Sequence, residues 1–270
     1  MRAGPAALAR RFMAVLLSLG AAVVSANSGG THLTFVGCPI LRNTELPCWL
    51  GEYNGDLYFL GPQGDLTAEF YPPEFGHQML VEGEVAGGPR ICGGVVLKAV
   101  KVSVLPDLDV ACNVMLPADA FPDPPNNRGS GPSGVRGGVA PPPPPRPAPK
   151  EYKPPYTPRV FTANFNADSE RLWRQAQIAI EDAARFAGAA SASKIEITGY
   201  RAAIRLSNGR DYVERSIIAE RRAKAVEEAL HNVGIPQSAR VVVAWRAAAI
   251  PYSDAVANPQ GRSVSVRVVP

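Results

Sequence analysis

The side chains that could do chemistry are few and widely spaced along the chain. Its three histidines, His32, His77 and His231, show no metal-ligand spacing and have no nearby carboxylate or cysteine pattern. The sequence contains no nucleophile elbow, zinc-protease motif or phosphate-binding glycine loop. We therefore interpret each histidine as a surface or turn residue. The sequence favours a binding function over an enzymatic one, and we expect no metal and no cofactor.

The cysteines form a second group of reactive side chains. All four, Cys38, Cys48, Cys92 and Cys112, lie in the first half of the chain. In an exported protein, an even number of cysteines within one small region predicts two disulfides. A zinc site made of four thiolates is disfavoured, because no two cysteines have the C-x2-C spacing. Three disulfide pairings are possible, and the sequence does not choose between them.

One arginine occupies an unusual position on a predicted helix. A helix is expected over residues 214–232, and Ile218, Arg222 and Val226 fall on one of its faces because steps of four return to the same side. A guanidinium on an apolar face needs an internal carboxylate or a ligand anion to offset its desolvation. The alternative is that the side chain runs along the edge of the face and keeps its charge in water.

The first 26 residues are typical of a secretory signal peptide. Arg2, Arg10 and Arg11 give a positive start, residues 12–24 are apolar, and the Val-Ser-Ala of residues 24–26 fits the small-x-small cleavage rule. An ordinary secretory signal is favoured over a twin-arginine signal. The apolar run is too short for a spanning helix, which needs about 20 residues. We expect an exported protein with no transmembrane segment in its mature chain.

Composition divides the rest of the chain into three parts. Short apolar runs separated by turn signals such as Asn54-Gly55 predict a small all-β domain at residues 27–120, called the head below. Residues 121–157 are rich in proline and glycine and predict a disordered linker. The head carries 4 basic and 11 acidic residues, whereas residues 151–270 carry 17 basic and 12 acidic ones. These opposite net charges influence the choice of partner rather than the fold.

Residues 158–270 form a C-terminal domain in which strands and helices alternate. The first helix is expected to start at a cap on Asp168 or Ser169 and to run to Ala187. The predicted order β-α-β-α-β-β gives an α+β two-layer sandwich with both helices on one face of the sheet. The expected elements are strand 160–165, helix 168–187, strand 194–198, helix 214–232, strand 240–245 and strand 263–268.

The C-terminal domain also carries several short motifs in a fixed order. They are Phe165-Asn166-Ala167-Asp168-Ser169, Ile195-Glu196-Ile197-Thr198-Gly199, Ala219-Glu220-Arg221-Arg222-Ala223-Lys224-Ala225-Val226 and Asn258-Pro259-Gln260-Gly261-Arg262-Ser263-Val264. Together with the order of elements, they make residues 158–270 resemble an OmpA C-terminal-like domain. This resemblance implies non-covalent peptidoglycan binding, in which the domain holds the diaminopimelate of the stem peptide.

The resemblance also implies roles for single residues, and it shows departures from the family pattern. Arg222 matches the arginine that pairs with the ligand carboxylate, and Arg262 matches the second arginine of the closing motif. The family aspartate that grips the ligand ammonium is replaced by Ala202. The asparagine that precedes the second helix in the family is replaced by Arg215. These two replacements affect the ligand site itself.

An insertion accompanies these replacements. About five extra residues lie between the second strand and the second helix, and Asn208-Gly209 within this region predicts a β-hairpin in the place of the ligand loop. Asp211 or Glu214 would then supply the missing carboxylate. Alternatively, the pocket has been lost and the fold is retained for another partner.

The head resembles an uncharacterised cysteine-containing β domain that precedes OmpA-like modules in alphaproteobacterial envelope proteins. This resemblance implies no activity for the head.

Two hypotheses for the function of the chain follow. In the leading hypothesis, a periplasmic protein at the outer membrane or cell wall binds peptidoglycan through Arg222, and Arg201, Arg205 and Arg262 attract anionic groups of the wall. The head would then meet an envelope protein. In the rival hypothesis, the OmpA-like fold of a periplasmic scaffold protein has become a protein-interaction module. We expect no nucleic-acid partner.

Overall fold

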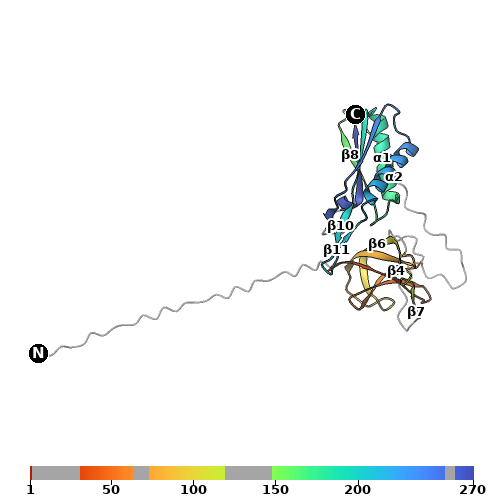
Figure 1. Ribbon diagram of the computed structural model, residues 1–270, viewed down its shortest axis with the longest axis vertical. Coiled ribbons are helices and arrows are strands. Elements are labelled where there is room, and N and C mark those ends of the chain that lie inside the picture. The colour runs from red at the N-terminus through yellow and green to blue at the C-terminus, as the bar shows by residue number, and fades with distance from the viewer. Residues whose placement is uncertain (2–30, 64–72, 119–147, 253–258) are drawn as a thin grey trace.

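The computed structural model describes Met1 and residues 31–63, 73–118, 148–252 and 259–270 (Figure 1). The predicted signal peptide and most of the predicted linker lie outside these residues. Among the described residues, no helix combines the length and the hydropathy that crossing a lipid bilayer would need. The described chain folds into an N-terminal β region and a mixed α and β region, as the sequence predicts.

The head consists of one seven-stranded sheet with the strand order β1-β5-β6-β4-β3-β2-β7. Most neighbours are antiparallel, while β4 pairs with β6 and β2 with β7 in parallel. The predicted turn at Asn54 and Gly55 joins β3 to β4, and both residues have positive φ, which suits a tight hairpin. The strands are β1 (His32–Gly37), β2 (Pro39–Arg42), β3 (Cys48–Tyr53), β4 (Asp56–Pro62), β5 (His77–Val85), β6 (Val95–Leu108) and β7 (Val114–Leu116).

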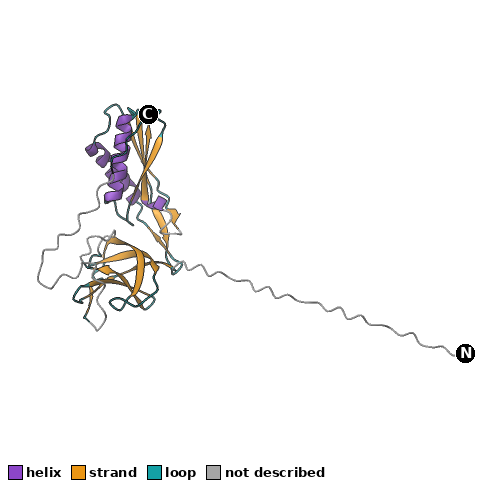
Figure 2. Cartoon of the chain, turned by 180° about the vertical axis from the view of Figure 1, so that it is seen from behind, coloured by secondary structure: helices purple, strands orange, loops and turns teal. Residues whose placement is uncertain are grey.

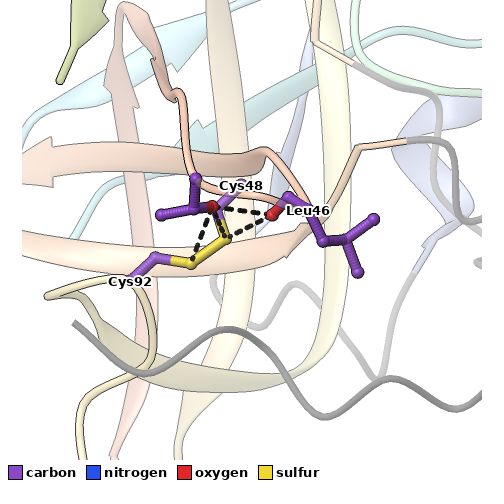
Figure 3. The surroundings of a disulfide bond; sticks show 4 residues. Leu46, Cys48 and Cys92 are labelled. Carbon is purple, nitrogen blue, oxygen red and sulfur yellow. Dashed lines mark hydrogen bonds between the residues drawn. A yellow bond between two sulfur atoms is a disulfide. The ribbon is translucent and has the colours of Figure 1, made fainter. Parts of the chain in front are cut away.

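Two disulfides cross-link the head, and the structure shows which of the three possible cysteine pairings it contains. Cys38 is bonded to Cys112, and Cys48 to Cys92. The second bridge ties the start of β3 to the segment before β6 and lies beside Leu46, whose carbonyl oxygen is 3.4 Å from the sulfur of Cys48 (Figure 3). Each bridge closes a long loop, which lowers the entropy of the unfolded chain.

The C-terminal domain is a four-stranded sheet, β12-β9-β14-β8, with two helices on one face (Figure 2). This is the predicted two-layer arrangement. The helices close the domain core because their apolar stripes, including Ile180 and Val226, pack on the sheet residues Ile195, Ile197 and Val266. The elements are β8 (Arg159–Asn164), α1 (Arg174–Ala189), β9 (Lys194–Gly199), α2 (Ile218–Val233), β12 (Arg240–Trp245), the short 3-10 helix η1 (Pro259–Arg262) and β14 (Ser263–Val269).

Both helices begin later than the sequence predicts. Helix α1 starts at Arg174 rather than at a cap on Asp168 or Ser169, because Asp168 has a positive φ and its carboxylate accepts hydrogen bonds from another segment. Helix α2 starts at Ile218, which leaves Glu214 in the preceding loop. The predicted end of α2 is confirmed, since Gly234 takes the positive φ that a helix C-terminus favours.

The insertion forms the predicted hairpin. Strands β10 (Ala202–Arg205) and β11 (Asp211–Val213) pair antiparallel around a turn in which Gly209 has a positive φ. Strand β13 (Ile250–Tyr252) adds to β10 in parallel, so that a second sheet of order β11-β10-β13 stands beside the main one.

The segment just before β8 differs from the expectation of a disordered linker through residue 157. Tyr152 and Tyr156 pack against the domain core and contact the ring of Phe186 edge-on, with ring centroids 5.1 and 6.0 Å away. Arg159 lies over the rings of Tyr152 and Phe186. These aromatic contacts extend the C-terminal domain toward the N-terminus beyond residue 158.

Candidate functional site

Arg222 lies in the first turns of α2 and is fully buried. A guanidinium has five N–H donors, and all five are used inside the protein. Two of them donate to the two carboxylate oxygens of Glu214, at 2.5 and 3.0 Å. The other three donate to the backbone carbonyl oxygens of Asn166, Ser169 and Tyr200. In this conformation Arg222 has no donor left for an external carboxylate.

Glu214 is equally well satisfied. Its side chain is fully buried, and each carboxylate oxygen accepts one bond from Arg222 and one from a backbone amide. The amide of Asp168 donates to Oε1 at 2.8 Å, and the amide of Ala202 donates to Oε2 at 2.6 Å. A bidentate, fully hydrogen-bonded pair of this kind can offset the desolvation of both charges. Glu214 therefore provides the internal carboxylate that a buried Arg222 requires.

The carboxylate of Asp168 holds the neighbouring loop in place. It accepts hydrogen bonds from the Tyr212 hydroxyl and from the backbone amide of Arg215. Burial and the Asp168 carboxylate raise the pKa of Tyr212 well above its usual value, so this hydroxyl remains a donor at every physiological pH. The hairpin that ends at β11 and the loop that leads to α2 are thus fixed to the loop before α1.

Arg262 forms a second buried ion pair, and its partner comes from the head. Its Nη1 and Nη2 atoms donate to the two carboxylate oxygens of Glu82 on β5, at 2.8 and 3.1 Å. Both side chains are almost completely buried. Lys101 on β6 lies directly across the strand pair from Glu82. Burial and the Arg262 guanidinium lower the pKa of Lys101 to about 8, and the Glu82 carboxylate opposes them.

The hairpin formed by β10 and β11 lies against the head (Figure 1). The Ser207 amide donates to the Thr34 carbonyl at 2.8 Å, and the Thr34 amide donates to Ser207 Oγ at 2.9 Å, so the hairpin contacts the edge strand β1 at Thr34. The Ala167 amide donates to Ser103 Oγ of β6 at 3.0 Å. We call this contact region the junction. A small apolar cluster completes it, made of Leu80 and Leu105 from the head and Ala167, Ala202 and Ile204 from the C-terminal domain.

The structure does not bring the four predicted ligand residues into one open site. Arg222 and Arg262 are sealed in separate ion pairs. Asp211 lies on the surface of the hairpin and pairs with Arg205 at 2.7 Å. Arg201 donates to the backbone carbonyl oxygens of Ala247 and Glu214. Of the two carboxylates proposed as substitutes for the family aspartate, Glu214 contacts Arg222.

Two hollows border the junction. One, of about 490 Å³, lies between the β3–β4 turn of the head and the hairpin, with Tyr53, Asn54 and Asp211 in its lining. The other, of about 400 Å³, is lined by the loop before α1, by Arg215 and Arg221, and by the β6 residues Val104 and Pro106. Neither Arg222 nor Arg262 lines either hollow. The two buried guanidiniums are therefore separated from these surface depressions.

Comparison with known proteins identifies the C-terminal domain. The OmpA family model matches residues 164–263, which confirms the resemblance read from the motifs, so the C-terminal domain is an OmpA-like domain. No curated protein sequence matches the chain. The resemblance that we noted for the head has no counterpart in the family match and stays a prediction.

Similar solved structures align with about two fifths of the chain. The OmpA-like domain of FopA1 from Francisella tularensis subsp. tularensis SCHU S4 is 19% identical and has a TM-score of 0.31, with 41% of this chain and 71% of that chain covered. A putative MotB-like protein from Desulfovibrio vulgaris is 14% identical, with a TM-score of 0.28 and coverages of 41% and 75%. The periplasmic domain of Helicobacter pylori MotB is 15% identical, with a TM-score of 0.28 and coverages of 42% and 74%.

Proposed function

We propose that the protein is a non-enzymatic cell-envelope protein whose OmpA-like domain works as a protein-interaction module and does not hold a stem peptide through Arg222. At the level of the family, an OmpA-like domain supports a peptidoglycan-associated envelope protein, and such domains are typically binding modules rather than enzymes. The observation that carries the proposal is the complete use of the five Arg222 donors by internal acceptors, two of them on Glu214.

The pairing of Arg222 with Glu214 matters because any external carboxylate must compete with Glu214 for Arg222. An external carboxylate could bind Arg222 only by displacing Glu214, which is eight residues away in the same domain and therefore always present at a high effective concentration. Displacement would also leave the buried Glu214 carboxylate without its ion-pair partner, and this costs several kcal/mol. A stem peptide outside the domain has no such high effective concentration near Arg222.

The second candidate is the cell-wall tether. It is favoured by the match to the OmpA family and by the surplus of basic residues in the C-terminal part of the chain. In this case the wall would be held by exposed cationic groups near the junction, or by Arg222 after Glu214 has been displaced. Export to the periplasm, which the first 26 residues predict, is common to both candidates.

Retention on isolated sacculi, with free diaminopimelate as a soluble competitor, separates the two candidates. The full mature chain is incubated with sacculi, and the bound fraction is measured with and without millimolar diaminopimelate. The interaction-module proposal expects no retention on sacculi with or without the competitor, and retention that diaminopimelate does not remove would support a tether through exposed cationic groups. Retention that diaminopimelate abolishes, and that is lost in Arg222→Lys but kept in the exposed neighbour Arg221→Lys, would establish the tether instead.

A positive test of the interaction module uses the exposed tip of the hairpin. A photo-crosslinking residue at Asn208 should join the protein to one defined envelope protein in intact cells, and the same residue at the exposed Arg240, on β12, serves as the matched control. The same single partner must be captured in repeated experiments from position 208 and not from position 240. Equal capture from both positions would contradict a hairpin-centred module.

A further inference from the structure

The junction between the head and the OmpA-like domain rests on few contacts of mixed chemistry. They include the buried pair of Glu82 with Arg262, the reciprocal hydrogen bonds of Thr34 and Ser207, and a small apolar cluster that contains two alanines. Interfaces between domains of one chain resemble transient protein interfaces, and relative motion is expected unless the interface is large and hydrophobic. The junction combines a buried ion pair and hydrogen bonds with one apolar cluster, so its contacts are compatible with repeated docking and release.

We propose that the head is a reversible cover of the OmpA-like domain, latched by the Glu82–Arg262 ion pair, and that its release exposes Arg262. This inference goes beyond the proposed function, because it concerns an opening step and holds whichever partner the OmpA-like domain binds. The released surface would present Arg262 together with Ala167, Ala202 and Ile204, which pack against Leu80 and Leu105 of the head in the docked state.

The two buried ion pairs differ in how they can break. Glu214 and Arg222 belong to one domain, so separating them leaves both charges inside the same core. Glu82 and Arg262 lie 180 residues apart, on separate domains. Movement of the head as a unit would carry Glu82 away and let water reach both ions. Breaking the Glu214–Arg222 pair therefore incurs the heavy cost of an unpaired buried charge. Release of the head avoids this cost for the Glu82–Arg262 pair.

This arrangement couples ligand binding to docking. Any anion that binds Arg262 must compete with the Glu82 carboxylate, so it binds the released state better than the docked state. A ligand that distinguishes two states shifts their populations, by an amount set by its differential affinity. Conversely, a partner that binds the head only in its docked state would keep Arg262 covered.

Hydrogen exchange of the full mature chain tests the latch, because the Thr34, Ser207 and Ala167 amides donate directly across the junction. In the wild type these three amides should exchange at a common rate, faster than the amides of the two domain cores. Glu82→Gln should accelerate the three by on the order of 100-fold, since it breaks a buried ion pair, and should leave the cores protected. Glu84→Gln, on the same strand, is the matched control and should change little.

A milder variant covers the case in which Glu82→Gln fails to fold. Ser207→Ala removes only the hydroxyl that accepts the Thr34 amide at the hairpin tip, without leaving a buried charge. It should accelerate exchange of the distant Ala167 amide by about 2- to 10-fold, the effect of one lost hydrogen bond. The proposal is overturned if the junction amides of the wild type exchange only as slowly as the cores, or if either variant accelerates the cores and the junction together.

Discussion

Glu214 and Ala202 are joined by two hydrogen bonds: the Ala202 amide donates to the Glu214 carboxylate at 2.6 Å, and the Glu214 amide donates to the Ala202 carbonyl at 3.0 Å. This relationship links two departures from the family pattern. The resemblance to the OmpA family places the family aspartate at position 202, where this chain has alanine, and the Glu214 carboxylate lies beside that position. A carboxylate on both residues would place two like charges in one buried site, so the alanine and the glutamate are mutually compatible.

Restoring the family residue should therefore destabilise this chain. Ala202→Asp adds a buried carboxylate next to Glu214, and we expect a loss of about 3 kcal/mol or more in the free energy of unfolding. Urea denaturation measures the loss, with Ala203→Asp on the same strand as the control for strand propensity. Combining Ala202→Asp with Glu214→Gln should recover part of the loss. No recovery in the double variant would contradict charge repulsion as the cause.

Removing the charge of Glu214 should be costly as well. Glu214→Gln leaves the fully buried Arg222 guanidinium without a counter-ion, and breaking such a pair typically costs about 3 to 5 kcal/mol. The matched control is Glu220→Gln, whose pair with Lys224 lies on the surface of α2 and contributes under about 0.5 kcal/mol. Equal unfolding free energies for the two variants would show that the buried pair contributes no more than the surface pair.

The pKa of Lys101 predicts a rise in stability with alkaline pH. This pKa is about 8 in the folded protein, compared with an ordinary value of 10.5, because burial and Arg262 disfavour the charged form. Between these values the unfolded chain binds more protons, so the free energy of unfolding increases with pH. Below about pH 8 the penalty of a charged Lys101 is fully present.

Urea denaturation from about pH 7 to about pH 9.5 measures this rise. Lys101→Met should flatten it, and Lys98→Met, at an exposed position on the same strand, should preserve it. The charged groups that act on Lys101 are Arg262, Glu82, Arg222 and Glu214. Equal slopes for the wild type and Lys101→Met would rule out this residue as the source.

The head should depend on its disulfides. The Cys48–Cys92 bridge spans a sequence separation of 44 residues, and replacing both cysteines by alanine should lower the free energy of unfolding of the head by about 2 to 4 kcal/mol. Replacing Cys38 and Cys112 should have a similar effect, because the stabilisation grows only with the logarithm of loop length. A loss below about 1 kcal/mol for both bridges would mean that the strand contacts alone hold the sheet.

Local patterns were enough to predict most of the architecture. Apart from β13, the order of strands and helices in the C-terminal domain follows from periodicity and turn chemistry, as do the two-layer sandwich and the Asn208-Gly209 hairpin. The presence of two disulfides follows from the cysteine count. The helix starts were wrong because Asp168 and Glu214, which sequence rules place at helix starts, bind groups from other segments instead. Tertiary hydrogen bonds overrode local preference at these two residues.

The candidate site was only partly predictable. The helical spacing indicated that a buried Arg222 needs an internal carboxylate or a ligand anion, and Glu214 was one of two nearby carboxylates. Glu82 carried no comparable signal, because an ion pair across 180 residues depends on how two domains dock. For the same reason the sequence did not show that Arg262 is covered by the head. Information of this kind resides in tertiary contacts and not in spacing along the chain.

The aromatic contacts before β8 determine where the C-terminal domain can be separated from the rest of the chain. A recombinant fragment that starts at residue 158 would lack Tyr152 and Tyr156, and Phe186 would lose both edge contacts. Tension applied to the chain between the two domains would likewise reach these rings before it reached the sheet. Under such tension, Tyr152 and Tyr156 would have to separate from Phe186 before β8 bears any load.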